Sequence, residues 1–448
     1  MGQTSYIETD GRTRTMKTIL VDFSMLGFVV VQAQDSINKN LSVHWQATII
    51  PQYHFTFNSP YEGTNSLLAK EGVKTSFTTT VFIDYHPFKN GYIVFAPEAA
   101  GGKGLSKTLG IAGFPNGEIY RVGNPAPQPY IARLYAEYQF PLYKEHIKRE
   151  RISDSSLNNL DRHFSVLFGK FSMTDFFDGS SASHDPRTQF LNWSLMASGA
   201  WDYPANVRGY TIGAVIQAFL GEWKIRAAMT SVPMEANGQE LQFKAGDAMG
   251  TALEIEKNNL VRESANFYTD LHFGVFYNNA RMGNYDSAVK SSPVNPDITL
   301  SRVYGRDKKG VYCIIDNHFG KVVHFVRASY NDGKNETWAF TEIDRSVATG
   351  ISINGEIWKR DKDILGIAAV VNGLSPEHRS YLYYGGYGFL IGDGRLNYGT
   401  EDIIEGYYSL NVLKGLYISP DYQFVSHPAY NKDRGPVSIV SIRAHYQL

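Results

Sequence analysis

The chain ends in the stretch PVSIVSIRAHYQL, Pro436 to Leu448, in which apolar and polar side chains alternate. In an extended strand, successive side chains point to opposite faces. One face of this strand is apolar and consists of Val440, Ile442, Ala444, Tyr446 and Leu448. The other face is polar and consists of Ser441, Arg443, His445 and Gln447. Such a strand fits a soluble sandwich, whose apolar face meets another sheet, or a membrane barrel, whose apolar face meets lipid and whose polar face lines a wet lumen.

The same period-two pattern recurs along the whole chain, and this recurrence favours the barrel. The β-rich segments are separated by glycine, proline and asparagine, and most approach the roughly 9 to 11 residues that a tilted membrane strand needs. The expected strands are residues 43–49, 76–85, 92–97, 131–140, 163–171, 209–219, 223–232, 251–257, 267–278, 310–319, 321–330, 340–353, 363–373, 400–412, 416–424 and 437–448. The sequence therefore predicts an all-β fold, a transmembrane antiparallel β-barrel of about 16 strands.

Two long polar segments, Gly101–Tyr130 and Thr174–Val207, interrupt this pattern. We expect loops of this size to fold into the pore. The glycines of the first segment lack the GxxxxGK[ST] spacing of a phosphate-binding loop. The chain is too short for a barrel of about 22 strands with a separate plug, so the pattern favours passive conduction.

Composition narrows the functional classes. Lys and Arg total 43 against 44 Asp and Glu, a formal net charge of -1, so the chain lacks the basic field expected of a nucleic-acid-binding protein. An aromatic content of 14% fits membrane-interface girdles or sugar-stacking surfaces. The single cysteine, Cys313, has no partner for an internal disulfide. No hydrolase or metal-binding motif is found, so we predict a protein that is not an enzyme and has no cofactor or metal.

The N-terminal residues carry the features of an export signal. Met16-Lys17 supplies a basic start, Met25–Val31 an apolar core, and Val31-Gln32-Ala33 a small-residue cleavage pattern. We therefore predict that residues 1–33 are an N-terminal extension and signal peptide, with the true start at Met16. Residues 34–448 are predicted to form a single outer-membrane β-barrel domain.

Several stretches resemble a known family across nearly the whole mature chain. They are TLGIAGFPNGEIYRVG (108–123), PYIARLY (129–135), GKFSMTDFFD (169–178), SHDPRTQFLNWSLMASGAWDYPANVRGYTIGAV (183–215), PMEANG (233–238), MGNY (282–285), TWAFTEID (337–344), NGLSPEHRSYLYYGGYGFLIGDGRLNYG (372–399) and DYQFVSHPAYNKDRGPV (421–437). Together they resemble the carbohydrate-selective porins of the OprB-like family.

This resemblance implies a sixteen-stranded barrel in the bacterial outer membrane that passes mono- or oligosaccharides by diffusion, with loops folded inward to narrow the pore. The implied partners are the transported sugars, outer-membrane lipid and the barrel assembly machinery, with a monomer or trimer as the assembly and no nucleic acid. The chain departs from the family pattern at its end, because it finishes in Leu448 where these strands usually finish in phenylalanine.

The second long segment holds the residues that we expect at the constriction. A sugar-selective pore needs aromatic faces for the sugar ring and charged or amide groups for its hydroxyls. The candidates in this segment are Asp185, Arg187, Asn192, Trp193, Trp201, Asp202, Tyr203, Asn206 and Arg208. A second interpretation is that the same residues only brace the loop against the barrel wall through ion pairs.

Strand alternation adds candidates on the lumen face of the wall. These are Arg133, Glu137, Asp421, Gln423, Arg443 and His445. Two alternative functions remain open at this point. One is a secreted β-rich sugar-binding protein or glycoside hydrolase, which would be soluble without detergent. The other is a general or anion porin that keeps the fold and changes the solute.

Overall fold

The computed structural model describes residues 40–119, 126–142 and 162–448. The predicted signal peptide, the start at Met16 and the beginning of the mature domain at residue 34 lie outside these residues. The assignment of residues 34–448 to a single domain therefore remains a prediction.

Sixteen antiparallel strands form one closed barrel, in which β1 pairs with both β2 and β18. This confirms the predicted fold class and strand number. The barrel strands are β1 (Leu41–His54), β2 (Lys74–Phe88), β3 (Gly91–Gly102), β4 (Gln128–Pro141), β5 (Arg162–Phe171), β6 (Thr211–Leu220), β7 (Trp223–Thr230), β10 (Met249–Ser264), β11 (Phe267–Met282), β12 (Val303–Phe319), β13 (Val322–Asn331), β14 (Arg345–Asn354), β15 (Ile364–Gly373), β16 (Glu401–Leu413), β17 (Leu416–Ser426) and β18 (Val437–Gln447).

One expected strand begins later than its sequence indicated. Residues 340–344 were expected in a strand, but β14 begins at Arg345. The buried carboxylates of Glu342 and Asp344 accept backbone N–H groups from the loop between β15 and β16. The segment therefore ties two loops together instead of extending the sheet.

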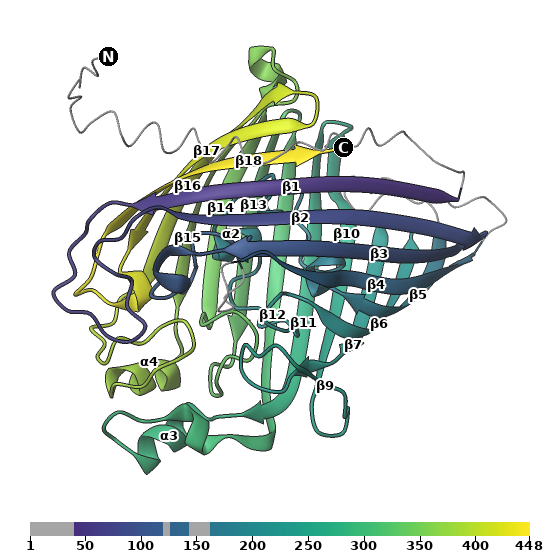
Figure 1. Cartoon of the computed structure of the whole chain (residues 1–448). Coiled ribbons are helices and arrows are strands. Elements are labelled where there is room, and N and C mark those ends of the chain that lie inside the picture. The colour runs from purple at the N-terminus through teal and green to yellow at the C-terminus, as the bar shows by residue number, and fades with distance from the viewer. Residues whose placement is uncertain (1–39, 120–125, 143–161) are drawn as a thin grey trace, which may run out of the picture.

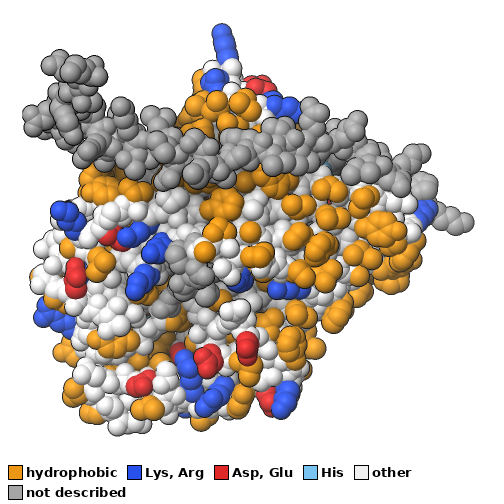
Figure 2. Space-filling view, in the orientation of Figure 1, with side chains coloured by type: hydrophobic (Ala, Val, Ile, Leu, Met, Phe, Trp, Pro, Cys, Tyr) orange, Lys and Arg blue, Asp and Glu red, His pale blue; other side chains and the backbone are white. Residues whose placement is uncertain are grey.

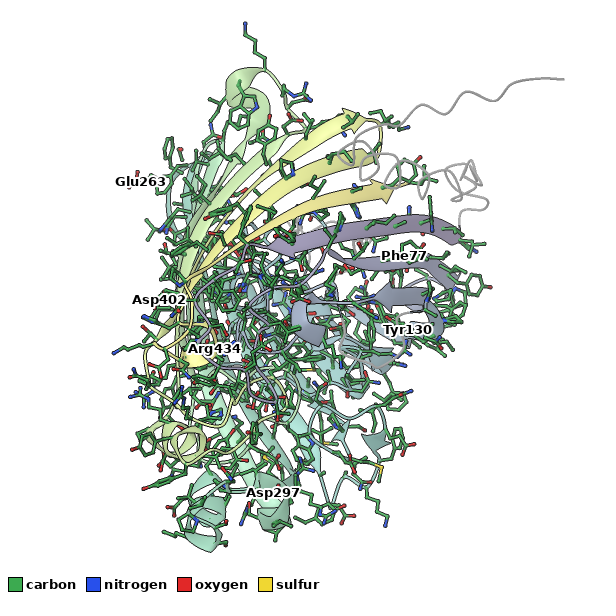
Figure 3. All side chains as sticks on the ribbon, turned by 60° about the vertical axis from the view of Figure 1, so that its left-hand side comes forward. Phe77, Tyr130, Glu263, Asp297, Asp402 and Arg434 are labelled. Atoms are coloured by element: carbon green, nitrogen blue, oxygen red, sulfur yellow. The ribbon has the colours of Figure 1, made fainter. Side chains whose placement is uncertain are left out.

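The two ends of the barrel differ in the length of their connections. Among the connections that the structure describes in full, short turns such as Gly221-Glu222 and Gly320-Lys321 lie at one end, and the longest loops lie at the other. Figure 3 shows Glu263, near the end of β10 beside the β10–β11 turn, and Asp297, in the β11–β12 loop, at opposite ends. In outer-membrane barrels the long loops are extracellular and the short turns periplasmic.

Among the described residues the helices are short and most lie in the long loops, whereas the 3-10 turn Gly355–Trp358 lies in the β14–β15 connection at the short-turn end. They are α2 (Trp193–Met196), α3 (Tyr285–Ser291) and α4 (Pro376–Tyr383), with 3-10 turns at Leu105–Lys107, Met173–Asp175, Ile298–Ser301, Gly355–Trp358 and Pro428–Tyr430. A small hairpin, β8 (Val232–Pro233) and β9 (Leu241–Gln242), lies in the β7–β10 loop. Figure 1 shows α3 and α4 beyond the strands at the long-loop end. None of the described helices has the length and apolar character to cross a membrane.

The outer surface is apolar around the strands. In β18, Ile442 is 55% exposed, whereas its neighbour Arg443 is 1% exposed and points into the barrel. Figure 2 shows hydrophobic side chains gathered over β3–β7, with charged groups toward the long-loop end. The closing strand thus faces as its alternation predicts, with the apolar side toward lipid.

The interior is filled largely by the loop between β5 and β6, residues 172–210, which we call the inward loop. Its helix α2 packs against β14 and β15 inside the barrel, and Figure 1 shows it within the ring of strands. Buried loop side chains pack with wall side chains in two hydrophobic clusters. One includes Phe177 of the loop, and the other includes Phe190 and Leu195 of the loop with Phe325 and Tyr407 of the wall. The structure thus confirms that a long loop folds into the pore.

Candidate functional site

Six adjacent strands, β13–β18, which we call the anchoring wall, hold the central part of the inward loop. Arg327 on β13 donates to the carbonyl oxygens of Leu195 and, at 2.8 Å, of Ser183. Glu405 on β16 accepts the backbone N–H of Leu191 at 2.5 Å. Both side chains use their hydrogen-bonding groups to hold the loop backbone, because a buried charge needs hydrogen-bonding partners.

A cavity of about 390 Å³ lies on the opposite side of the inward loop. Strands β1–β4, which we call the cavity wall, contribute Gln46, Thr78, Phe82, Glu98 and Arg133 to its lining. The inward loop contributes its other side, and Phe340 and Leu390 from two further loops also line it. The cavity therefore lies between the loop and the wall, where a solute crossing the barrel would pass.

Glu98 is the centre of the polar lining. Its carboxylate accepts hydrogen bonds from Thr80 at 2.5 Å, from Tyr210 at 3.2 Å and from the Tyr130 hydroxyl. Arg187 of the inward loop lies 3.0 Å from the same carboxylate. Four donors on one buried carboxylate fix its position and neutralise its charge.

Arg187 joins the inward loop to the wall and to the β3–β4 loop. Besides Glu98 it pairs with Glu118 at 2.8 Å. Burial opposes its charge, but Glu118 and Glu98 outweigh burial and raise the pKa of Arg187 well above its ordinary value. Burial raises the pKa of Glu118 even though Arg187 opposes the shift. Arg187 therefore bridges the wall residue Glu98 and the loop residue Glu118 at the cavity.

Two further arginines line the same cavity. Arg133 donates to both oxygens of Asp175, at 2.8 and 2.5 Å, and its guanidinium lies 5.5 Å from the centre of the Tyr210 ring. The guanidinium of Arg208 lies 4.1 Å from the centre of the Tyr130 ring. Tyrosine faces beside arginine give the lining both cationic and apolar character.

Four aromatic rings form a cluster beside these charges. Trp193 stacks on Phe114 with ring centres 4.9 Å apart and an interplanar angle of 17°. Its ring centre is also 5.2 Å from that of Phe340 and 5.8 Å from that of Tyr203. All four residues line the cavity. Flat aromatic faces next to hydrogen-bonding groups suit the two sides of a sugar ring.

The structure brings some of the predicted residues to the cavity and keeps others away from it. Those on the lining are Arg133, Asp185, Arg187, Trp193, Tyr203 and Arg208. Asp185 accepts the backbone N–H of Arg187 at 3.0 Å. Burial opposes its ionisation, but the charge and backbone of Arg187 outweigh burial and lower the pKa of Asp185.

Three candidates of the inward loop lie behind the lining. Trp201 is 1% exposed and packs against Tyr312 with ring centres 5.1 Å apart. Asp202 accepts the backbone N–H groups of Trp338 and Ala339 at 2.7 and 2.8 Å. Asn192 caps α2 by accepting the N–H of Ser194 at 3.0 Å. The contacts of these three residues agree with the second interpretation, in which residues of this segment brace the loop against its surroundings.

The remaining candidates on the strands point into the barrel but do not reach this cavity. Glu137 accepts a hydrogen bond from Gln139 at 3.1 Å. Asp421 lies next to Glu405, and Arg443 donates to the carbonyl oxygens of Pro186 and Gln189 in the inward loop. Alternation fixes the face of a strand residue, but the path of the loop decides what that residue meets.

Sequence reasoning missed several lining residues, namely Phe114, Glu98, Glu118, Tyr130, Asp175 and Tyr210. Glu98 was overlooked because the expected strand ended at Pro97, whereas β3 continues to Gly102. The alternation of Val94, Ala96, Glu98 and Ala100 along β3 carried a usable signal. Nothing local in the sequence pointed to Tyr130 or Tyr210, because their role depends on the meeting of β4 with the inward loop.

One group of side chains has the composition of a metal site. Ligand atoms of Glu254, Glu256 and His272 lie within 4.8 Å of one another inside the barrel. However, Arg226 donates to Glu254 and Glu256 at 2.8 and 2.7 Å, so a guanidinium already supplies the positive charge there. We therefore assign this group to the internal ion pairs of the barrel.

A closed sixteen-stranded barrel with an apolar belt, a polar lumen and an inward loop defines the class of outer-membrane porin barrels. The model of the carbohydrate-selective porins of the OprB family matches residues 88–448, so the chain belongs to this family. Its location is accordingly the bacterial outer membrane.

Known proteins of similar sequence are also porins. The chain is 21% identical over 281 residues to Porin AaxA of Chlamydia abortus, a match that covers 63% of this chain and 53% of the relative. It is 22% identical over 281 residues to Porin AaxA of Chlamydia caviae, with the same coverage. The chain thus spans about half the length of the curated relatives that it matches.

Among solved structures, the chain is similar to the high-pH structure of Pseudomonas putida OprB. The TM-score is 0.67 at 12% sequence identity, and the match covers 97% of this chain and 96% of the other. This likeness supports the architecture of the barrel.

Proposed function

We propose that the chain is a passive, carbohydrate-selective outer-membrane pore for mono- or oligosaccharides. The observation that carries the proposal is the joint presence, on one cavity, of the Phe114–Trp193–Tyr203–Phe340 cluster and of hydrogen-bonded charges. Family membership supports the choice of sugars as solutes. Diffusion through the cavity involves no catalysis and needs no cofactor.

The charge arrangement favours uncharged polar solutes. Arg187 is paired with Glu98 and Glu118, and Arg133 with Asp175. The lining as a whole carries three arginines, which include Arg208, against four carboxyl groups, which include Asp185, so neither sign of charge strongly dominates it. An ion crossing this region gains little net attraction, whereas sugar hydroxyls can exchange hydrogen bonds with groups of both kinds. This weak, multiple binding suits a solute that must also leave.

The proposal includes partners and an assembly state. The partners are sugar solutes, outer-membrane lipid and the barrel assembly machinery, and the assembly is a monomer or trimer. Within the proposed lining we assign solute contact to Arg133, Asp185, Arg187, Trp193, Tyr203 and Arg208. Asn192, Trp201, Asp202, Glu137, Asp421 and Arg443 are assigned to the support of that lining.

The test is single-channel recording in planar bilayers with a panel of mono- and disaccharides. We expect stepwise channels whose current a sugar blocks saturably. Trp193→Ala should raise the half-blocking sugar concentration about tenfold, because stacking on one aromatic face contributes about 1 kcal/mol or more. Trp223→Ala, on the exposed outer surface, is the matched control and should leave the block unchanged.

Two results would contradict the proposal. Channels that conduct ions without block by any sugar would indicate a general porin of the same fold. Folded protein that stays soluble without detergent and forms no channels would indicate a secreted sugar-binding protein.

A further inference from the structure

The anchoring wall contains a pair of buried carboxyl groups that the proposed lining does not use. Glu405 on β16 and Asp421 on β17 lie within hydrogen-bonding distance of each other. Glu405 is fully buried and Asp421 is 5% exposed. Two carboxylates this close in a buried site cannot both carry a negative charge without a large electrostatic cost.

The hydrogen bonds of the two groups are not equivalent. Each oxygen of Glu405 accepts a backbone N–H of the inward loop, Oε1 from Leu191 at 2.5 Å and Oε2 from Asn192 at 2.9 Å. Asp421 accepts at Oδ1 from Gln423 at 3.3 Å, and its buried Oδ2 has no donor among the described residues. An ionised Glu405 suits two N–H donors, and a proton on Asp421 Oδ2 would supply the missing bond.

The charge balance of the site agrees with this assignment. Arg443 is 1% exposed and donates at 2.7 and 2.6 Å to the carbonyl oxygens of Pro186 and Gln189. One negative charge on the carboxyl pair would match the single positive charge of Arg443. A second negative charge would leave the buried site unbalanced.

The position of this cluster gives it a consequence for the pore. Glu405 accepts backbone N–H groups of loop residues 186–192, and Arg443 donates to backbone carbonyl oxygens of the same segment. That short segment carries Arg187, which bridges the cavity, and leads directly into Trp193. A shift of the segment would move both residues of the lining.

We infer that Glu405 and Asp421 share one proton, carried by Asp421, and that Glu405 is thereby a positioning residue for the part of the inward loop that sets solute selectivity. The inference rests on the proposed function for its sugar readout, but its proton and its effect on ion conductance do not. The other titratable groups that face the pair are Tyr407 from β16 and Arg443 from β18, and Asp185 of the loop faces Arg443 in turn.

The experiment compares Glu405→Gln with Asp421→Asn. An amide at position 421 donates a hydrogen bond as the protonated acid would, so Asp421→Asn should keep ion conductance and sugar block within about twofold of wild type. An amide at position 405 offers one acceptor oxygen to two N–H groups. Glu405→Gln should therefore raise open-channel conductance and raise the half-blocking sugar concentration about tenfold.

The pH profile gives a readout that a merely structural role would not produce. In the wild type, alkaline pH removes the shared proton and the two negative charges repel, so sugar block and low conductance should be lost as the pH rises. Asp421→Asn has no such proton, so its sugar block and its conductance should not change as the pH rises. In the infrared spectrum, the wild type should show a protonated-carboxyl band at neutral pH that Asp421→Asn removes.

Asp270→Asn, another carboxyl-to-amide change, is the matched control and should leave conductance, block and the infrared band unchanged. It lies on β11, pairs with His318 and accepts the backbone N–H of Asn259, and within the described parts of the chain no hydrogen bond or ion pair joins it to the inward loop. Heat-dependent gel migration and circular dichroism establish that each variant folds.

Three results would overturn the inference. One is a Glu405→Gln channel with wild-type conductance, and another is equal damage by both variants in folded protein. The third is an infrared band that survives Asp421→Asn. A wild type that no sugar blocks would contradict only the proposed function, because conductance and infrared absorption still test the proton and the loop position.

Discussion

The anchoring wall and the cavity wall carry the same kinds of lumen-facing side chains but use them differently. On the anchoring wall, Arg327, Glu405 and Arg443 make hydrogen bonds to the backbone of the inward loop. On the cavity wall, Glu98 and Arg133 bond to other side chains around an open space. The comparison teaches that the same alternation yields support where a wall side chain meets the backbone of the inward loop, and solute contact where it meets loop side chains around the cavity.

The largest effect should come from removing an anchoring charge. Arg327 is 1% exposed and lies 3.6 Å from Asp178, whose pKa is raised by burial while Arg327 opposes the shift. Arg327→Met should lower the free energy of unfolding by about 3 to 5 kcal/mol, because it leaves a buried carboxyl group without its partner. Denaturant unfolding in detergent, followed by tryptophan fluorescence, measures this loss.

The matched change on the cavity wall is Arg133→Met, which should lower stability by clearly less. Its pair with Asp175 borders the cavity, where water can solvate the remaining carboxylate. Equal losses for the two variants would break the distinction between the walls.

An effect of intermediate size is expected from acid. Burial opposes the ionisation of Asp344, but His378 and Lys308 outweigh burial and hold its pKa below the ordinary range. A lowered carboxyl pKa adds stability above the pKa of the unfolded chain, about 3.9, and this stability is lost as pH falls toward the folded value.

Asp344→Asn should therefore lower the free energy of unfolding by about 2 kcal/mol at neutral pH and flatten its decline in acid. Thermal melting between neutral and acidic pH measures both. A variant that keeps the full acid dependence of the wild type would show that this group does not stabilise the anchored loops.

Arg187 links the two regions, so its loss sharpens the comparison through ion selectivity. Arg187→Gln leaves Glu98 and Glu118 without their cation. We expect the preference for cations over anions to rise about fivefold, which corresponds to about 1 kcal/mol of charge interaction in water. The reversal potential in a salt gradient measures this preference.

Acidification should reverse that gain, because Glu118 has a raised pKa and is neutralised as the pH falls. Unchanged selectivity in a folded Arg187→Gln channel would show that the bridge lies away from the ion path.

The smallest effect concerns one hydroxyl on the cavity. Tyr210→Phe removes the 3.2 Å bond to Glu98, which keeps Thr80, Tyr130 and Arg187 as donors. Stability should fall by only about 0.5 kcal/mol. If Tyr210→Phe lowered the free energy of unfolding as much as Arg327→Met, Tyr210 would support the inward loop, and the division between the two regions would be wrong at this residue.

Much of the fold followed from local pattern. Alternation in segments such as 133–140 and 437–448 fixed both the strands and their lumen faces, because a slip by one residue would turn charged groups to lipid. It failed at residues 340–344, where buried carboxylates serve loop backbone, and at the end of β3, where Glu98 was left outside the expected strand.

The site was predicted only in part. The segment 174–207 was identified as the loop that enters the pore, and its Arg187, Trp193 and Tyr203 reach the cavity. Trp201 and Asp202 are residues of the same kinds in the same segment, yet Trp201 is buried against Tyr312 on β12 and Asp202 against the β13–β14 loop. No periodicity governs an irregular loop, so its exposed and buried residues look alike in the sequence.

By itself, the sequence determined the barrel, its strand number and which side chains point inward, because these depend on a two-residue period and on contact with lipid or water. The motifs also determined the family. Tertiary structure alone decided that the inward loop lies on β13–β18 and leaves the cavity along β1–β4. That choice depends on contacts such as Glu405 to Leu191, between residues far apart in the chain, which no local pattern records.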